Sequence, residues 1–166
     1  NNLYFSFTSA RPLFDNLNLT IAKGSSLCVV GHERAGKTTL FRLIKGLINP
    51  SAGAVTFRPE ARTSFLNVGY LGGDPNDSFV GVTVEEEIVF GPENLGLAVK
   101  EIRARLNQAL ELTGLKGYEQ RLVHTLSGGE QQQLALAAAL VMDLHVLILD
   151  DALSMMYPPS RNRHWA

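Results

Sequence analysis

Apolar and polar positions follow a strand-like pattern in the first part of the chain. Apolar residues alternate with polar ones over residues 17–21, which predicts a half-buried strand. The apolar run at 26–30 predicts a short buried strand, and a helical pattern over 38–47 follows it after a glycine-containing loop. Further strands are expected at 54–57 and 65–71. This part of the chain is therefore expected to form strands together with one helix.

The pattern becomes helical in the second part. Apolar residues recur at helical spacing over 99–110, and Gly114 lies where that helix is expected to end. Ser127 begins a long helix whose later part, 134–142, is almost wholly apolar, so we expect it to be deeply buried. A short apolar run at 146–149 then predicts a buried strand. The order of these elements predicts an α/β domain with a helical insertion.

Composition limits the classes of protein to consider. The chain has 166 residues, 45% of them hydrophobic and 19% charged, as expected of one globular domain. Its net charge of −1 argues against a nucleic-acid partner, because neutralising phosphates requires a basic patch. The lone cysteine, Cys28, excludes an intramolecular disulfide and is expected in the core. No apolar stretch approaches the roughly 20 residues of a membrane span, so a membrane role requires a partner protein.

The strongest functional motif covers residues 31–38, which read Gly-His-Glu-Arg-Ala-Gly-Lys-Thr and match G-x-x-x-x-G-K-[ST]. In such a loop, backbone N–H groups and the start of the following helix form a positive nest for phosphates. Lys37 is expected to reach the β- and γ-phosphates, and the Thr38 hydroxyl is expected to bind Mg²⁺. An ordinary glycine turn is the alternative, but the strand predicted before the loop and the helix predicted after it favour phosphate binding.

A second motif, Leu-Ser-Gly-Gly-Glu at 126–130, marks the start of the long helix. Ser127 is expected to be its N-cap, and Glu130 is expected to complete a capping box. The motif also has a functional interpretation, because Gly128 and Gly129 would let a phosphate approach the positive end of the helix closely.

These motifs and the apolar strand ending in Asp150 occur in the order found in the ABC ATPase family, which the chain resembles over residues 3–156. The segment 79–97 is similar to the ATPase subunits of energy-coupling-factor and cobalt-type importers, which take up vitamins and metal ions. The resemblance implies an α/β P-loop NTPase (ABC ATPase) core with an N-terminal antiparallel β part and a helical insertion at about 76–143. It also implies a single ABC ATP-binding domain over 1–166 that is incomplete at its C-terminal end.

The resemblance further implies a head-to-tail dimer that holds ATP and Mg²⁺ between the phosphate loop of one subunit and the 126–130 signature of the other. Asp150 would complete the magnesium shell with Thr38, and Asp151 takes the place of the catalytic carboxylate. Phe7 falls where the family usually has an adenine-stacking tyrosine, and a plain strand-core role is an equal alternative. The implied nucleotide-binding residues are Phe7, Gly31, Ala35, Gly36, Lys37, Thr38, Thr39, Ser127, Gly128 and Gly129.

The chain departs from the family pattern at the catalytic end. Gly73 stands where the family has a glutamine that senses the γ-phosphate. Asp151 replaces the catalytic glutamate, which retracts the carboxylate by about 1.5 Å. Tyr157 replaces an aspartate, and His164 lies too close to Asp150 to be the switch histidine of the family. We therefore expect slow or absent hydrolysis by this chain alone, since a misplacement of about 1 Å can cost on the order of 100-fold in rate.

The phosphate loop carries two departures of its own, Glu33 and Arg34 in place of the common Asn-Gly. A Glu33 side chain turned inward would repel phosphate, so we expect it to face solvent. Arg34 must adopt whatever backbone geometry the usual glycine supplies.

The main hypothesis is an importer ATPase subunit that is peripheral on the cytoplasmic face of the plasma membrane. Its expected partners are a second ATP-binding subunit, identical or different, and an integral membrane transport component, with no nucleic acid. A hydrolysis-deficient nucleotide-binding subunit or a truncated remnant is the alternative. An ABC-type DNA-repair or chromosome-structure ATPase is disfavoured, because such proteins need a long coiled-coil insertion or a basic surface, and neither is visible.

Overall fold

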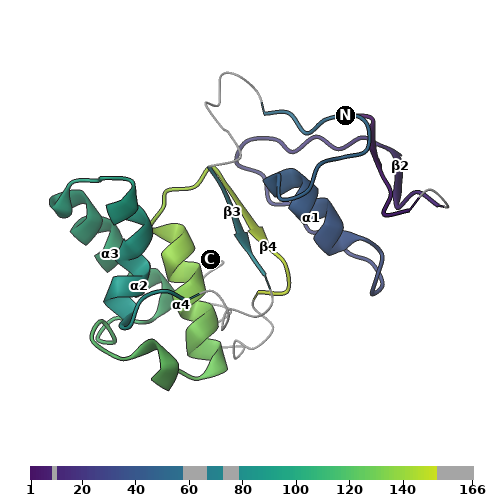
Figure 1. Ribbon diagram of the computed structural model, residues 1–166. Coiled ribbons are helices and arrows are strands. Elements are labelled where there is room, and N and C mark those ends of the chain that lie inside the picture. The colour runs from purple at the N-terminus through teal and green to yellow at the C-terminus, as the bar shows by residue number, and fades with distance from the viewer. Residues whose placement is uncertain (9–10, 58–66, 73–78, 153–166) are drawn as a thin grey trace. The chain divides into compact units, whose positions relative to one another are not determined.

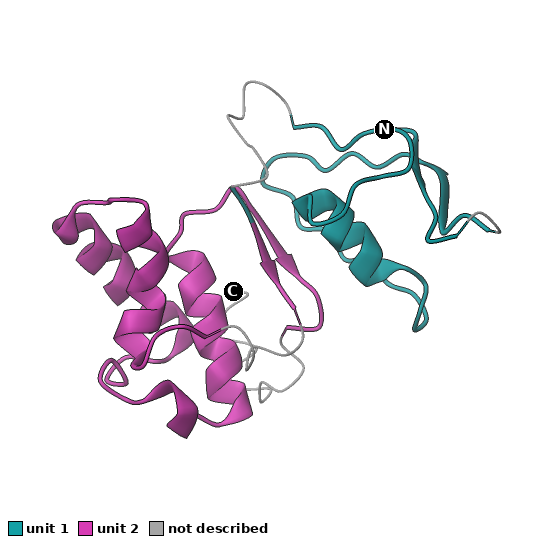
Figure 2. Cartoon of the chain, in the orientation of Figure 1, with its two compact units in different colours: residues 1–68 teal, residues 69–166 magenta. Residues whose placement is uncertain are grey.

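The computed structural model describes residues 1–8, 11–57, 67–72 and 79–152 (Figure 1). Contacts divide the chain into two compact units, residues 1–68 and 69–166 (Figure 2). Strands and helices occur in the mixture expected of an α/β protein. The expectation of a single domain stays a prediction.

The first unit contains a two-stranded antiparallel sheet, as expected for the N-terminal part of the chain. Strand β1 (Leu3–Phe5) pairs with β2 (Phe14–Leu17), and Leu3 lies opposite Leu17 in the register. Both strands are short, so the sheet depends on packing against another element for its stability.

That element is helix α1 (Lys37–Lys45), which begins one residue before the expected start. Leu40 and Leu43 lie three positions apart and therefore share a face of the helix. They are buried together with Leu3 and Phe5 from β1, which makes a small core between helix and sheet.

Two strands expected in this unit differ from the structure. The strand expected at 17–21 is displaced, because β2 ends at Leu17. Leu19 and Ile21 are exposed, so their alternation with polar residues does not bury an apolar face. Residues 54–57 form no strand either. Alternating polarity produces a strand only where a neighbouring segment satisfies its backbone hydrogen bonds and covers one face.

The apolar run at 26–30 also forms no strand and is not buried, contrary to expectation. Val30 is 88% exposed, and Cys28, which we expect in the core, is exposed as well. A buried strand needs partners for its N–H and C=O groups and cover on both faces. Among the described residues of the first unit, no strand pairs with this run.

The second unit consists of packed helices and a second two-stranded sheet. Strand β3 (Val68–Leu71), whose first residue belongs to the first unit, pairs with β4 (Val146–Leu149). The strand expected at 146–149 is present, but of its four residues only Ile148 is buried, whereas the sequence predicts a buried strand. The helices are α2 (Val84–Asn94), α3 (Val99–Thr113), the short 3₁₀ helix η3 (Val123–Thr125) and α4 (Gly128–Leu140).

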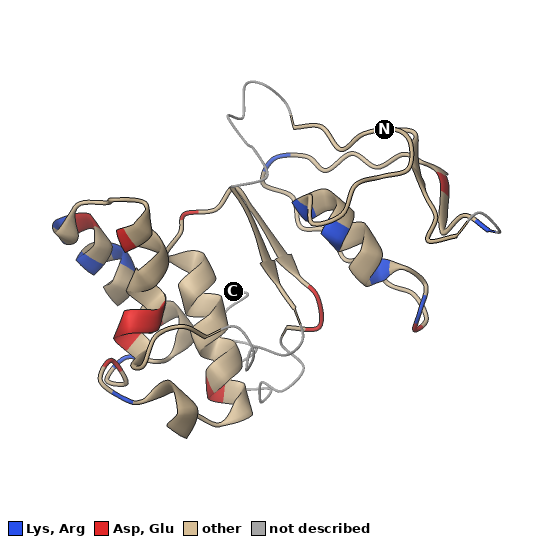
Figure 3. Cartoon of the chain, in the orientation of Figure 1, with Lys and Arg blue, Asp and Glu red and all other residues tan. Residues whose placement is uncertain are grey.

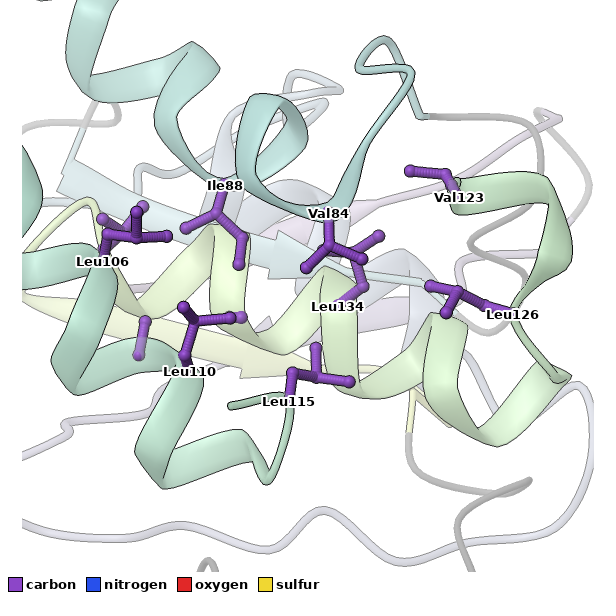
Figure 4. Close-up of a cluster of buried hydrophobic side chains, with 11 residues drawn as sticks. Val84, Ile88, Leu106, Leu110, Leu115, Val123, Leu126 and Leu134 are labelled. Atoms are coloured by element: carbon purple, nitrogen blue, oxygen red, sulfur yellow. The ribbon is translucent and has the colours of Figure 1, made fainter. Parts of the chain in front are cut away.

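Helices α2, α3 and α4 contact one another in pairs and enclose a common apolar core. Figure 4 shows its side chains converging from the three helices and the segments that join them. Val84, Ile88, Leu110, Leu115 and Leu134 are each at most 1% exposed. The burial of long aliphatic side chains from separate helices is what holds this unit together.

The apolar stretch at 134–142 is buried on one side only, whereas the sequence predicts deep burial of the whole stretch. Leu134, Ala137 and Val141 are at most 1% exposed, whereas Leu140 is 38% exposed. The buried residues recur at helical spacing, so one side of α4 faces the core although nearly every residue of the stretch is apolar.

The helix expected over 99–110 is present as α3, and it ends where a glycine follows. Gly114 takes a left-handed φ of +75°, and its N–H bonds to the carbonyls of Glu111 and Leu110. Glycine adopts this conformation without a Cβ penalty, which makes it a common helix terminator.

Candidate functional site

The segment that matches the phosphate-binding motif forms a tight loop in the first unit. The Lys37 Nζ donates hydrogen bonds to the carbonyls of Gly31, at 2.7 Å, and His32, at 2.8 Å. The N–H of Ala35 donates to the His32 carbonyl at 3.2 Å and completes a turn. The loop thus holds a lysine ammonium at the N-terminal end of α1, where phosphate binding requires it.

Gly36 joins the loop to α1 in a conformation that favours glycine, and side chains pack closely around it. Its φ is +93°, in the region that side chains disfavour. A Cβ at this position would lie 3.0 Å from Leu13 Cδ2 and 3.1 Å from Phe14 Cζ, closer than ordinary contacts. The motif glycine therefore lets the helix begin directly after the loop.

A cavity of about 350 Å³ opens beside the loop, entirely within the first unit. It is lined by Phe7, Leu13, Arg34, Gly36, Lys37, Thr38 and Thr39. All of these except Leu13 and Arg34 are nucleotide-site residues predicted from the sequence. Phe7 comes to the loop from the region after β1. Gly31 and Ala35 belong to the loop but do not line the cavity.

Phe7 is not a core residue, so the strand-core alternative is wrong. It is 70% exposed, whereas Phe5, two positions earlier, is 7% exposed. The two rings meet edge to face, with 4.9 Å between their centroids. An exposed ring at the wall of the cavity is available to a planar base, and adenine stacking stays a prediction.

The substituted positions of the loop are placed as expected. Glu33 is exposed and does not line the cavity, so its carboxylate faces solvent. Arg34 takes the left-handed backbone that the motif usually assigns to glycine, with φ of +60°.

The signature motif at 126–130 caps helix α4 in the second unit. The Glu130 carboxylate accepts hydrogen bonds from the N–H of Ser127, at 2.7 Å, and from its hydroxyl, at 2.9 Å. The N–H of Glu130 donates in return to the Ser127 Oγ at 3.4 Å, which confirms the predicted capping box. Gly128 and Gly129 form the first turn, whose N–H groups lie at the positive end of the helix.

The sequence does not reveal two side chains that support this cap. An Nη atom of Arg121 lies 3.1 Å from Glu130 Oε1. The Arg121 guanidinium lies over the Tyr118 ring, 4.3 Å from its centroid. Nine residues separate Arg121 from Glu130 along the chain, and no local sequence rule connects positions at that spacing.

These contacts hold the pKa of Glu130 below its ordinary value. The largest cause is the hydrogen bond from the Ser127 backbone N–H, which stabilises the charged carboxylate. Partial burial opposes it, while the Ser127 hydroxyl, the Arg121 charge and Tyr118 lower the pKa further.

Glu130→Gln is expected to remove a pH-dependent part of the stability. Because the folded-state pKa lies below the unfolded value of about 4.3, Glu130 stabilises the fold above that pH and loses this effect as the pH falls through the folded pKa. In urea denaturation from pH 7 to pH 2.5, the wild-type advantage over the variant should therefore shrink with acid. The exposed Glu111→Gln is the control. A Glu130→Gln difference that stays constant over this range would contradict the assignment.

Asp150, the predicted magnesium ligand, follows β4 directly. Its N–H donates to the Leu71 carbonyl at 2.9 Å, and its Oδ2 accepts a hydrogen bond from the Tyr70 hydroxyl at 2.9 Å. Tyr70 lies on β3, 80 residues earlier in the chain, so only the fold reveals this partner. Carboxylate oxygens are ligands that Mg²⁺ prefers, and the magnesium role of Asp150 stays a prediction.

Asp151, the predicted catalytic carboxylate, is exposed and has φ of +61°. Aspartate adopts this left-handed conformation more readily than most residues. Within the described ranges, no group of three or more His, Cys, Asp or Glu side chains could hold a metal ion.

The predicted site residues are divided between the two units. The phosphate loop belongs to the first unit, and the signature and Asp150 belong to the second. Gly73, Tyr157 and His164 lie outside the described residues. No helix in the described part of the chain has the length and apolar character needed to span a membrane.

Solved structures of known proteins have a similar fold. The cbiO1 protein from Clostridium perfringens, described as part of the ABC transporter complex cbiONQ, matches with a TM-score of 0.82 and 27% identity. The match covers 97% of this chain and 67% of that chain. A bacterial Atm1-family ABC exporter with ATP bound matches with a TM-score of 0.79 at 24% identity, which supports the fold alone.

Sequence comparison leads to the same family. An energy-coupling factor transporter ATP-binding protein, EcfA1 from Streptococcus pyogenes serotype M12, is 37% identical in an alignment of 158 residues that covers 91% of this chain. The chain spans 56% of the length of that relative. EcfA1 from serotype M5 of the same species matches to the same extent. The model of the ABC transporter family matches residues 14–154, most of the sequence. On this evidence the chain belongs to the ABC transporter family.

Proposed function

We propose that this chain is the ATP-binding subunit of an ABC importer for a vitamin or a metal ion. It would couple the binding and hydrolysis of MgATP to transport across the membrane. The observation that carries the proposal is the cavity beside the phosphate loop, which Lys37, Thr38, Thr39 and the exposed Phe7 line together. Similarity to energy-coupling factor ATP-binding proteins supports the role in transport.

In this proposal, the residues of the first unit bind the nucleotide. The N–H groups of the loop and the Lys37 ammonium bind the phosphates, and the Phe7 ring stacks on the adenine. The Thr38 hydroxyl and the Asp150 carboxylate would each supply an oxygen to Mg²⁺, which would neutralise part of the phosphate charge. The Tyr70 hydroxyl orients the Asp150 carboxylate by holding one of its two oxygens.

The signature residues Ser127, Gly128 and Gly129 act toward a second ATP-binding subunit, identical or different. They contact the γ-phosphate that this partner holds, because their N–H groups lie at the positive start of α4. An integral membrane component carries the substrate, and the chain is peripheral on the cytoplasmic face of the plasma membrane.

Calorimetric titration of the chain with MgATP tests the proposal directly. We expect saturable binding of MgATP and no measurable binding of adenosine, because the loop supplies phosphate contacts that adenosine cannot use. If the folded chain binds neither compound, the loop does not form a working nucleotide site and the proposed function is wrong.

Hydrolysis by the chain alone is expected to be slow, well below about 1 per second. Asp151 is one C–C bond shorter than glutamate, so Asp151→Glu should raise the rate on the order of 100-fold by returning the carboxylate to its usual reach. The rate of phosphate release, measured for the wild-type chain and for Asp151→Glu, gives this difference. Asp143→Glu is the matched control, since Asp143 is also exposed with a positive φ, +52°.

The same experiment separates the proposal from its alternative, a hydrolysis-deficient subunit or remnant. The exposed, short carboxylate of Asp151 is the observation that favours this alternative. A wild-type rate of about 1 to 10³ per second would contradict the expected slow hydrolysis. If Asp151→Glu leaves the rate unchanged while MgATP still binds, the chain is a nucleotide-binding subunit without catalytic competence.

A further inference from the structure

Arg34 has an unfavourable backbone conformation at the wall of the cavity. Its φ of +60° lies in the left-handed region, where a Cβ crowds the neighbouring carbonyl oxygen. A glycine would adopt this conformation without that cost. Strained residues of this kind cluster at active sites and ligand clamps, so the conformation of Arg34 favours a functional reason for a side chain at this position.

The charge of Arg34 is also unopposed where it lies. Basic residues occur along α1 (Figure 3), but Lys37 and Arg34 are the charged residues that line the cavity. Lys37 already donates to two loop carbonyls. Within the part of the chain that the structure describes, Arg34 forms no salt bridge.

Glu33, the acidic residue next to Arg34, does not line the cavity. The lining therefore carries two positive charges and no negative one, which favours an anionic ligand. A planar guanidinium matches the geometry of phosphate oxygens and can donate two parallel hydrogen bonds to them.

We propose that Arg34 is a second cationic ligand for the phosphate chain of the nucleotide, acting beside Lys37. This inference rests on the proposed function, since it assumes that the cavity takes a nucleoside triphosphate. It adds a phosphate contact from the arginine side chain itself, at a loop position that usually carries a glycine.

The proposal is testable because one substitution should change two quantities in opposite directions. Loss of a phosphate contact should weaken ATP binding, whereas relief of the loop strain should raise the thermal stability. Arg34→Gly removes the charge and also the conformational strain, so ATP binding should weaken about tenfold while the thermal midpoint rises by about 2–4 °C. Arg34→Gln removes the charge but keeps the strain. Its ATP binding should therefore weaken by a similar factor, while its thermal midpoint should not rise. Arg34→Lys retains the charge and should lie between wild type and Arg34→Gln in affinity.

Two variants of the same unit serve as matched controls. Arg42→Gln removes an exposed positive charge of α1 that does not line the cavity, and it should leave ATP binding unchanged. Asn16→Gly relaxes a positive φ of +55° outside the cavity, so it should affect stability but not binding.

The probes are MgATP and inorganic tripolyphosphate, each titrated into the full chain by calorimetry. If Arg34 contacts phosphates, Arg34→Gln should weaken the binding of both probes by about the same factor. Tripolyphosphate has no base, so an equal loss places the contact at the phosphates. If Arg34→Gln binds both as tightly as wild type while Lys37→Ala binds neither, Arg34 is not a phosphate ligand and the proposed function stands. If wild type binds neither probe, both proposals are wrong.

Discussion

Lys37→Ala is expected to weaken MgATP binding about a hundredfold or more. The ammonium lies at the start of α1 and bonds to the Gly31 and His32 carbonyls, so it is positioned within the loop. A hydrogen bond to a charged group contributes about 1.5–3 kcal/mol, and loss of two such bonds to phosphate oxygens corresponds to at least a hundredfold in the dissociation constant. Calorimetric titration of both proteins with MgATP measures the difference.

The loss must come from the site and not from unfolding. Lys23→Ala removes an exposed lysine from a turn of the same unit and should bind MgATP like wild type. Circular dichroism of Lys37→Ala should retain the wild-type helix signal, because the helices of the second unit do not depend on this lysine. Binding within about threefold of wild type would show that the loop does not contact phosphate through Lys37.

Leu134→Ala is expected to destabilise the second unit by about 3–5 kcal/mol. The Leu134 side chain is fully buried among those of Val84 and Ile88 in the core between α2, α3 and α4 (Figure 4). Truncation to alanine removes buried methyl groups and leaves a cavity that the neighbouring helices can fill only in part. Since domains are stable by about 5–15 kcal/mol, the change is a large share of the total. Urea denaturation followed by circular dichroism measures it.

Leu140→Ala is the matched control, since it makes the same substitution on the same helix. Leu140 is 38% exposed, so its truncation leaves no buried cavity and should lower the free energy of unfolding by less than about 1 kcal/mol. Equal effects of the two variants would show that the core around Leu134 does not stabilise the unit as its burial implies.

Helix ends in this protein follow from short-range sequence rules. Ser127 and Glu130 form the capping box that their spacing predicts, and Gly114 terminates α3 as expected. Each of these structures needs only residues within one helical turn of each other. The motif glycine Gly36 follows the same logic, since its left-handed φ is a property of the local loop.

Partners from distant parts of the chain were beyond prediction. Tyr70 reaches Asp150 across two strands that lie 80 residues apart, and Arg121 supports the cap of α4 from the preceding loop. Arg34 is identifiable in the sequence as a departure from the motif, but only the structure places it at the cavity beside Phe7. Such contacts depend on how segments pack, and residue spacing does not encode that directly.

By itself, the sequence determined the phosphate loop, the signature, the family and helices α3 and α4 of the second unit, whereas α2 was not predicted. Only the tertiary structure decided which apolar runs became strands, since 26–30 and 54–57 form none, and it decided that Phe7 is exposed. The physical reason is that helices and strands find the partners of their backbone hydrogen bonds in different places. A helix satisfies its backbone groups within its own residues, so a local pattern suffices to predict it. A strand needs another segment for its hydrogen bonds and its cover, and that partner is a property of the fold.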